Sequence, residues 1–472
     1  MATAKCNMDE YVKYESTCPL QPPYPTDPPY FLGDWMSNLM AISSFAEAPL
    51  SSITLPGTHD SLSYDLSLTV SADGIDDQER ISEWLRKLSL IHPNEIEEFM
   101  RLQAVTQKLD IVQQLDNGIR FIDVRIALEN RDIDDKKSEW YSIHCMQSNH
   151  QVRVYLQLIR DWMDKHPQEI VVIHLSRHGD VEADGEHAYP NTPIEEKQRF
   201  WRNYLNIFGE MLFDTSISDY RTTPMAQLLE VNHRLVTFAT DYEEFTSSSR
   251  YAYDAKIIQN EYNADCFNEK DVIQKQRDYF FSEKKPNNQQ WFSLKGMNTS
   301  VNDWQVKSAL RQRFLPIDLF DSCAKEVNIP GNKMCPRSVL DIAQLTNYYS
   351  QIPLEEAYKA HLNDKQEVNF PQAFYLDGID YGGTLRTGTT TLFGLGHEGS
   401  DKQFWYARYA FVDTVIGFIL HTVCNNVNIA DIEKCQLYTA NVNKKRQEHP
   451  ILLWQEPEVA RRDDWPSTAL TG

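Results

Sequence analysis

Residues 140–176 read WYSIHCMQSNHQVRVYLQLIRDWMDKHPQEIVVIHLS, and their hydrophobic pattern decides the fold class. The two ends, WYSIHC and EIVVIHLS, are short apolar runs of the kind that form strands. Between them, Leu158, Ile159 and Trp162 share one face at helical spacing, and Pro167 marks the end of that helix. Strands that alternate with helices in this way imply a parallel sheet.

The same alternation extends from Ile53 to Tyr381. Eight runs are predicted strands, and in chain order they are ITLPG, IRFIDVRI, WYSIHC, EIVVIHLS, HRLVTFAT, AKIIQNEY, WFSLKGMN and FYLDGIDY. Eight strands with intervening helices predict an α/β fold, an irregular (β/α)8 TIM barrel with helical insertions. In such a barrel the active site forms at the carboxyl ends of the strands.

The domain organisation follows from the stretches that fall outside this rhythm. We expect a Pro- and Tyr-rich extended arm over residues 1–44 and a single barrel domain over residues 45–472. Inserts are expected at about residues 65–117 and 305–370, followed by a C-terminal helical extension. The most apolar long run, Phe411–Val423, is too short to cross a bilayer and predicts a buried helix.

The chain is acidic, with a formal net charge of −22. This balance argues against a nucleic-acid partner, because such binding needs basic surface. It also argues against strong adhesion to anionic lipid, so any membrane contact is expected to be peripheral.

The eight cysteines leave two compartments open. Cys6 and Cys18, Cys323 and Cys335, and Cys424 and Cys435 form three pairs at short separation, which would suit disulfides in a secreted protein. The first twenty residues lack the pattern of a signal peptide, which favours a cytoplasmic protein with reduced thiols.

Polar residues recur where the predicted strands end, at His59, Asp60, Asp123, Arg125, His144, Arg177 and Asp380. Each has a purely structural alternative: His144 could be a core histidine, Arg125 could neutralise Asp123, and Asp380 could form a turn. Together they suit phosphodiester cleavage, in which one imidazole accepts a proton and a second donates one. A guanidinium would stabilise the phosphoryl charge, and a carboxylate would orient the basic imidazole.

Four motifs carry a resemblance to a known family. LPGTHDS (55–61), GIRFIDVRI (118–126), IHC and HPQEIVVIHLSR (166–177) resemble the X region of phosphatidylinositol-specific phospholipase C, of the bacterial metal-independent type. KIIQNEYNADCFNEKDVI and LDGIDY extend the resemblance, which spans roughly residues 45–385. It implies a (β/α)8 barrel in which the inositol 2-hydroxyl attacks phosphorus, releasing diacylglycerol and inositol 1,2-cyclic phosphate.

The resemblance also implies roles for individual residues. His59 corresponds to the general base and His144 to the general acid. Arg125 corresponds to the phosphate-stabilising arginine, Asp60 to its carboxylate partner, and Asp380 to the residue that orients His59. The expected substrate-binding residues are Arg177, Asn260, Tyr262 and Asp123.

The same comparison bears on cofactor and substrate. Calcium-dependent relatives carry carboxylates where this chain has Arg125 and near Arg177, so no metal and no other cofactor is expected. Thr240 and Asn260 depart from the bacterial pattern and leave the headgroup open. The expected substrate is a phosphoinositide, a glycosylated phosphoinositide or another phosphodiester. The alternatives are a metal-dependent glycerophosphodiesterase or phospholipase D, and a non-catalytic module that binds phosphoinositide headgroups.

Overall fold

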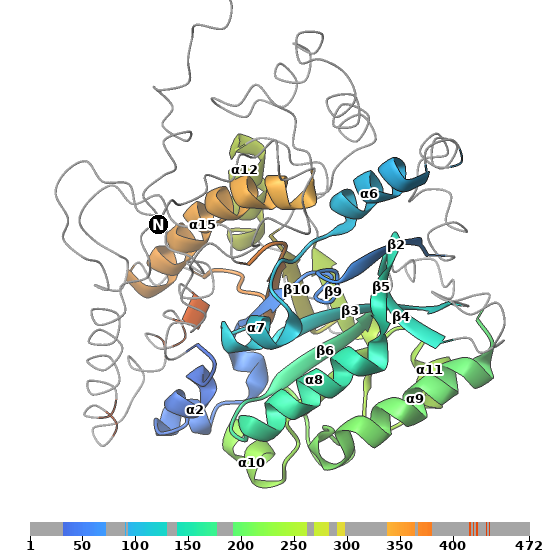
Figure 1. Ribbon diagram of the computed structural model, residues 1–472. Coiled ribbons are helices and arrows are strands. Elements are labelled where there is room, and N and C mark those ends of the chain that lie inside the picture. The colour runs from blue at the N-terminus through green and yellow to red at the C-terminus, as the bar shows by residue number, and fades with distance from the viewer. Residues whose placement is uncertain are drawn as a thin grey trace, which may run out of the picture.

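The computed structural model describes most of the chain between residues 32 and 379. The described ranges are 32–71, 90, 93–129, 139–176, 192–261, 269–282, 290–297, 338–363 and 367–379, with six single positions between 415 and 434. These residues form a mixed α/β fold around one eleven-stranded sheet (Figure 1).

Eight of the strands are parallel and follow one another around the sheet in chain order. They are β1 (Leu55–Thr58), β3 (Phe121–Glu129), β6 (Val171–Ser176), β7 (Leu235–Ala239), β8 (Tyr253–Asp254), β9 (Ile258–Glu261), β10 (Phe292–Gly296) and β11 (Ala373–Leu376). Each except β8 pairs with the next, and β11 pairs with β1, so the order is cyclic. Only the seam between β8 and β9 lacks a ladder among the described residues. The predicted irregular (β/α)8 barrel is confirmed.

Three further strands extend the sheet outside the barrel. β4 (Glu139–His144), β5 (Met146–Gln151) and β2 (Leu66–Val70) continue from β3 in antiparallel pairings. The prediction that WYSIHC is a parallel barrel strand is therefore wrong. Cys145, with a φ of 60°, lets the chain reverse directly after His144, and this reversal makes a hairpin. The barrel strand that the sequence analysis did not predict is β8. Its two residues are too few to show an alternation with a period of two.

The described helices lie around the barrel and its antiparallel extension. They are α2 (Trp35–Leu39), α3 (Ser43–Ala46), α6 (Pro93–Ala104), α7 (Ile111–Asp116), α8 (Val152–Lys165), α9 (Ile194–Phe208), α10 (Met225–Glu230), α11 (Tyr242–Thr246), α12 (Glu269–Phe280) and α15 (Val339–Asn363). In α8 the predicted face is confirmed for Ile159 and Trp162, which are buried, whereas Leu158 is exposed. No helix in the described ranges is both long enough and apolar enough to cross a membrane.

A buried ion pair anchors the segment that starts at residue 32 to the amino end of the barrel. Arg120 donates from Nε and Nη2 to Glu169, and its Nη2 also reaches the carbonyl of Gly33. The Trp35 indole donates to the carbonyl of Gly118 at 3.1 Å. Residues 32–39 thus pack into the barrel core, and the helix at their end lies at one end of the sheet (Figure 1).

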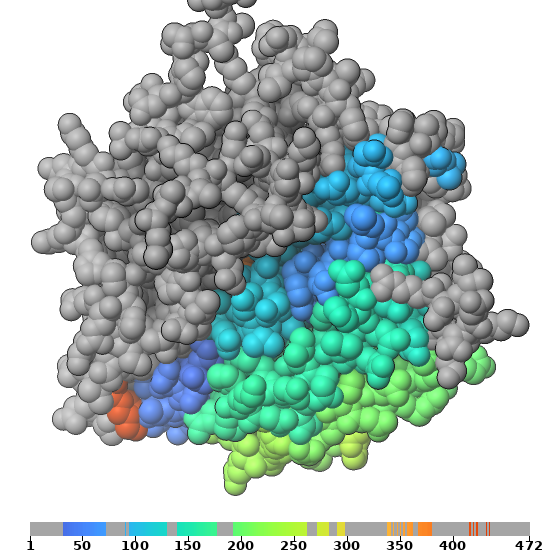
Figure 2. All heavy atoms as spheres, viewed as in Figure 1, coloured from blue at the N-terminus to red at the C-terminus, as the bar shows by residue number. Residues whose placement is uncertain are grey.

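Both predicted inserts contain ordered elements. β2, α6 and α7 lie in the first, and α15 lies in the second. Residues of β2 and α6, in blue, form surface beside those of β5 and α8 (Figure 2). Arg277 of α12 forms an ion pair with Glu356 of α15, so the helix of the second insert lies beside α12.

Candidate active site

The LPGTHDS stretch presents His59 and Asp60 at the carboxyl end of β1. Gly57 permits this placement, because a Cβ there would lie 2.6 Å from the carbonyl oxygen of Phe374 and 2.8 Å from Phe121 Cβ. His59 N–H still pairs with the next strand, donating to the Leu376 carbonyl at 3.1 Å. At Asp60 the backbone turns into the left-handed region, with a φ of 44°, and ends the strand.

His59 is held at both ring nitrogens. Its Nδ1 lies 2.7 Å from Oδ1 of Asp377, and its Nε2 lies 2.6 Å from Nη2 of Arg125. A guanidinium has only donors, so this contact requires Nε2 to accept. The geometry therefore fits a neutral imidazole whose Nδ1–H donates to Asp377 and whose Nε2 lone pair faces the site.

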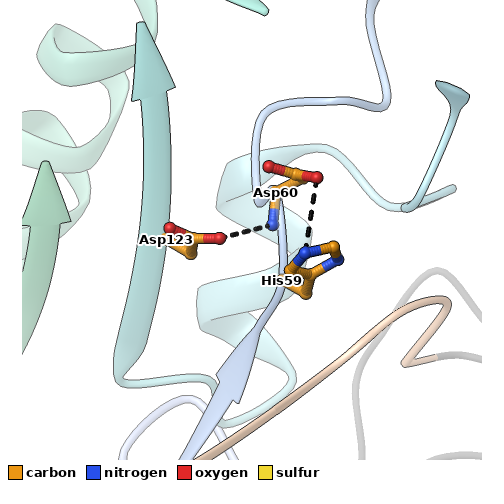
Figure 3. Close-up of side chains that lie close together, drawn as sticks. All are labelled: His59, Asp60 and Asp123. Atoms are coloured by element: carbon orange, nitrogen blue, oxygen red, sulfur yellow. Dashed lines mark hydrogen bonds and ion pairs between the residues drawn. The ribbon is translucent and has the colours of Figure 1, made fainter. Parts of the chain in front are cut away.

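Arg125 reaches the site from β3, where alternation places it on the same face as Asp123. Its Nε lies 2.5 Å from Oδ1 of Asp60 and 3.3 Å from Oδ2 of Asp123. Asp123 also accepts from the Asp60 backbone N–H at 3.1 Å (Figure 3). It accepts a further hydrogen bond from the Ser176 hydroxyl. Two carboxylates thus hold the Arg125 guanidinium in place. One of them, Asp123, is itself held by hydrogen bonds.

The second histidine lies across the same carboxylate. His144 Nδ1 is 2.6 Å from the Ala104 carbonyl, which only accepts, so Nδ1 carries a proton. Its Nε2 lies 3.4 Å from Oδ2 of Asp60, and His59 Nε2 lies 3.5 Å from the same oxygen. The two rings are 6.2 Å apart between centroids. Both Nε2 atoms therefore converge on one point.

Burial and charge move the two histidine pKa values in opposite directions. Burial lowers the pKa of His59, but the carboxylates of Asp60 and Asp377 outweigh it and raise that pKa above 6.5. Burial also lowers the pKa of His144, and there the charge of Asp60 alone does not compensate, so this pKa stays below 6.5. The difference arises because His59 has a second carboxylate neighbour.

A third histidine lies beneath the site. His174 of β6 is buried, and its Nδ1 lies 3.9 Å from Oδ1 of Asp123. Burial lowers the pKa of His174 to about 4, so it is neutral near pH 7. Burial raises the pKa of Asp123. The positive charges of Arg125 and of the nearby histidines outweigh this effect and lower that pKa to about 2.

Among the described residues, three groups could serve together as metal ligands. Donor atoms of His59, Asp60 and Asp123 lie within 4.8 Å of one another. Both carboxylates, however, already pair with the guanidinium of Arg125. Its positive charge opposes a second cation at this point, so the donor set fits an arginine better than a metal.

The structure brings together five of the predicted site residues, namely His59, Asp60, Asp123, Arg125 and His144. Arg177, Tyr262 and Asp380 lie outside the described residues.

Two further residues connect to this group. Asn260, a predicted binding residue, is exposed on β9 and accepts a hydrogen bond from the Tyr375 hydroxyl at 2.9 Å. The Tyr375 ring in turn lies 5.3 Å from the His59 ring. Asp377, which the sequence analysis did not select, is the described carboxylate that bonds His59 Nδ1.

A sequence signal for Asp377 did exist. LDGIDY contains two aspartates, and the resemblance led to the second, Asp380. The first directly follows the strand that pairs with β1, and Leu376 pairs with Thr58 in the last register position. The residue after Leu376 is therefore the neighbour of His59.

Comparison with known proteins shows which family this chain resembles. Residues 99–270 match the model of the PI-PLC X domain family, which confirms the resemblance drawn from the motifs. The matched segment contains Arg125 and His144, whereas His59 and Asp60 lie before it.

Curated relatives carry the same domain name. PI-PLC X domain-containing protein 1 of Homo sapiens is 29% identical over 179 residues, covering 38% of this chain and 49% of the relative. The protein of that name from Danio rerio is 34% identical over 143 residues, covering 30% and 43%. The chain thus spans about half the length of these relatives.

Solved structures show only distant likeness. A phosphatidylinositol-specific phospholipase C of S. aureus has a TM-score of 0.45 at 13% identity, covering 83% of this chain and 98% of that one. The enzyme of that name from Listeria monocytogenes has a TM-score of 0.41 at 15% identity, covering 74% and 94%. The fold assignment therefore depends on the strand order of this chain.

Proposed function

We propose that this protein is a phosphodiesterase that cleaves phosphatidylinositol-type lipids by two-histidine acid–base catalysis. One observation carries the proposal: Nε2 of His59 and Nε2 of His144 converge on Asp60, beside the guanidinium of Arg125. This arrangement supplies a proton acceptor, a proton donor and a cation for the phosphoryl oxygens. The similarity of residues 99–270 to PI-PLC X domains supports it.

In the proposed reaction the inositol 2-hydroxyl occupies the place of Arg125 Nη2 at His59 Nε2. His59 accepts the hydroxyl proton while the oxygen forms a bond to phosphorus. The bond from phosphorus to the diacylglycerol oxygen breaks, and His144 donates a proton to that oxygen. The products are diacylglycerol and inositol 1,2-cyclic phosphate, and the Arg125 guanidinium stabilises the phosphoryl charge.

The proposed roles require His59 to be neutral and His144 to be protonated. Before substrate binds, the pKa of His59 is raised and that of His144 is lowered, which favours the opposite distribution of protons. The contact with Arg125 already favours neutral His59. An anionic phosphate beside His144 favours its protonated form, because an opposite charge raises a histidine pKa. Substrate binding would therefore help to create the reactive protonation state.

The proposed mechanism uses no metal, because Arg125 supplies the positive charge at the phosphoryl group. The lipid substrate would require peripheral contact with a membrane or micelle.

A substrate panel tests the proposed function. The wild-type protein would be incubated with micelles of phosphatidylinositol, of a glycosylated phosphatidylinositol and of phosphatidylcholine, and the products followed by phosphorus NMR. We expect cyclic phosphate from an inositol lipid and none from phosphatidylcholine, which has no hydroxyl beside its phosphate. No turnover of any lipid, combined with shifts of the His144 resonances on adding inositol 1-phosphate, would instead support a headgroup-binding module.

A further inference from the structure

Two buried side chains outside the site contact the backbone that carries the His59–Asp377 pair. Gln107, between α6 and α7, is completely buried. Its Nε2 donates to the His59 carbonyl at 2.9 Å and to the Leu376 carbonyl at 2.8 Å. One amide group thus joins the ends of the adjacent strands β1 and β11.

Thr106 makes a parallel connection. Its hydroxyl donates to the Asp60 carbonyl at 3.0 Å, and its own carbonyl accepts from Gly378 N–H at 2.7 Å. The 106–107 segment therefore contacts both turns, the one that carries His59 and the one that carries Asp377.

The second amide comes from the other insert. Asn347 of α15 is buried, and its Nδ2 donates to the Asp377 carbonyl at 2.8 Å and to the Gly378 carbonyl at 3.2 Å. Gly378 has a φ of 52°, so the chain turns immediately after the aspartate. Asn347 bonds the two carbonyls of that turn.

These contacts begin where the sheet ends. The last register pair between β1 and β11 is Thr58 with Leu376, one residue before His59 and Asp377. Beyond that pair the ladder gives less control over the distance between the two side chains. Gln107 bonds both backbones and Asn347 bonds the turn at Asp377, and these contacts supply that control. Losing either donor would leave buried carbonyls unsatisfied.

We propose that Gln107 and Asn347 are positioning residues, which hold His59 Nδ1 and the Asp377 carboxylate at bonding distance and so fix the imidazole tautomer. The role of each insert in catalysis is then to carry one of these amides. This inference rests on the proposed function for its effect on turnover, but its effect on His59 is measurable without turnover.

Gln107→Met and Asn347→Leu keep the approximate volume and remove the donors. In each variant we expect kcat to fall about tenfold to a hundredfold with KM changed by less than about twofold, because the catalytic group is misplaced while binding contacts remain. We also expect the NMR titration midpoint of His59 to fall, because the Asp377 carboxylate that raises its pKa moves away. The groups around that imidazole are Asp60, Asp377, Asp123, Arg125, His144 and Tyr375.

Gln276→Met is the matched control, because Gln276 is an equally buried amide on α12. Its His59 titration and kcat should equal those of the wild type. If one test variant fails to fold, the other decides, since the two amides lie on different elements.

The proposal is overturned if a folded test variant titrates at His59 like the wild type, or if it loses only unfolding free energy. If the wild-type protein shows no turnover, the proposed function fails while the His59 titration still tests the positioning role.

Discussion

At the residue scale, the site depends on how three carboxylates are shared among an arginine and two histidines. Asp60 faces both His59 and His144, whereas Asp377 faces His59 alone. The difference in charge around the two imidazoles follows from this one extra neighbour. Because the two rings lie 6.2 Å apart and share Asp60, we interpret the pH dependence as that of the pair.

The first prediction concerns Asp377→Asn. The proposed reaction needs one proton on the histidine pair, so kcat/KM rises as the first proton leaves and falls as the last one leaves. The last proton leaves mainly His59, whose pKa is raised by Asp60 and Asp377 after burial has lowered it. Removing the Asp377 charge should therefore move the high-pH limb of the kcat/KM profile to lower pH.

Asp65→Asn is the control for that profile, because Asp65 accepts from His150 on the surface. It should leave both limbs where they are in the wild type. A high-pH limb unchanged by Asp377→Asn would contradict the assignment of Asp377 as the partner of His59.

At the element scale, the barrel is held at its amino end by a buried charge pair. Arg120 and Glu169 are both fully buried, and the pair also bonds the backbone of residues 33–37. Removing one partner leaves the other charge buried without compensation.

The second prediction is that Arg120→Met lowers the free energy of unfolding by about 3–5 kcal/mol. The measurement is the denaturant midpoint of unfolding, with the slope checked for a two-state transition. Arg277→Met is the matched control, because Arg277 pairs with Glu356 on the surface. That change should cost less than about 1 kcal/mol. Equal losses in the two variants would contradict a structural role for the buried pair.

Several elements were predictable because their local pattern and their tertiary role agree. In β3, alternation alone places Asp123 and Arg125 on one face. WYSIHC was not predictable in the same way, because its apolar residues suit a hairpin as well as a barrel strand. The reversal at Cys145 depends on a left-handed backbone conformation, and the sequence has no glycine at this position to indicate it.

At the scale of the whole molecule, the barrel was predictable from the alternation of strands and helices, although β4 was mistaken for a barrel strand and β8 was missed. The contributions of the two inserts were not predictable. Gln107 and Asn347 are ordinary polar residues in segments without a motif, and only the fold brings them to Asp377 and His59. Burial, rather than sequence pattern, makes these two amides significant.

The third prediction concerns stability against pH. His174 is buried and its pKa is lowered to about 4, so the folded state favours its neutral form. In the unfolded chain the pKa of this histidine is about 6.5. Its stabilising contribution to the folded state is therefore fully present above pH 6.5 and is lost as the pH falls toward about 4. The wild-type protein should therefore lose stability on acidification through this window, by about 3 kcal/mol from this group.

Urea unfolding at several pH values would measure that loss. His174→Gln should show a smaller loss between pH 7 and pH 4.5 than the wild type. His150→Gln, at an exposed histidine, should show the wild-type loss. The same pH dependence in His174→Gln and the wild type would rule out this histidine as its source.

The central claim is that two histidines and an arginine cleave the phosphodiester without a metal. The most direct test follows phosphatidylinositol micelles by phosphorus NMR in excess EDTA, comparing the wild type with His59→Ala and His144→Ala. We predict that the wild type forms the five-membered cyclic phosphate in the presence of the chelator and that both variants lose at least about a hundredfold in rate. Activity abolished by EDTA and restored by a divalent cation, or retained in either variant, would contradict the account.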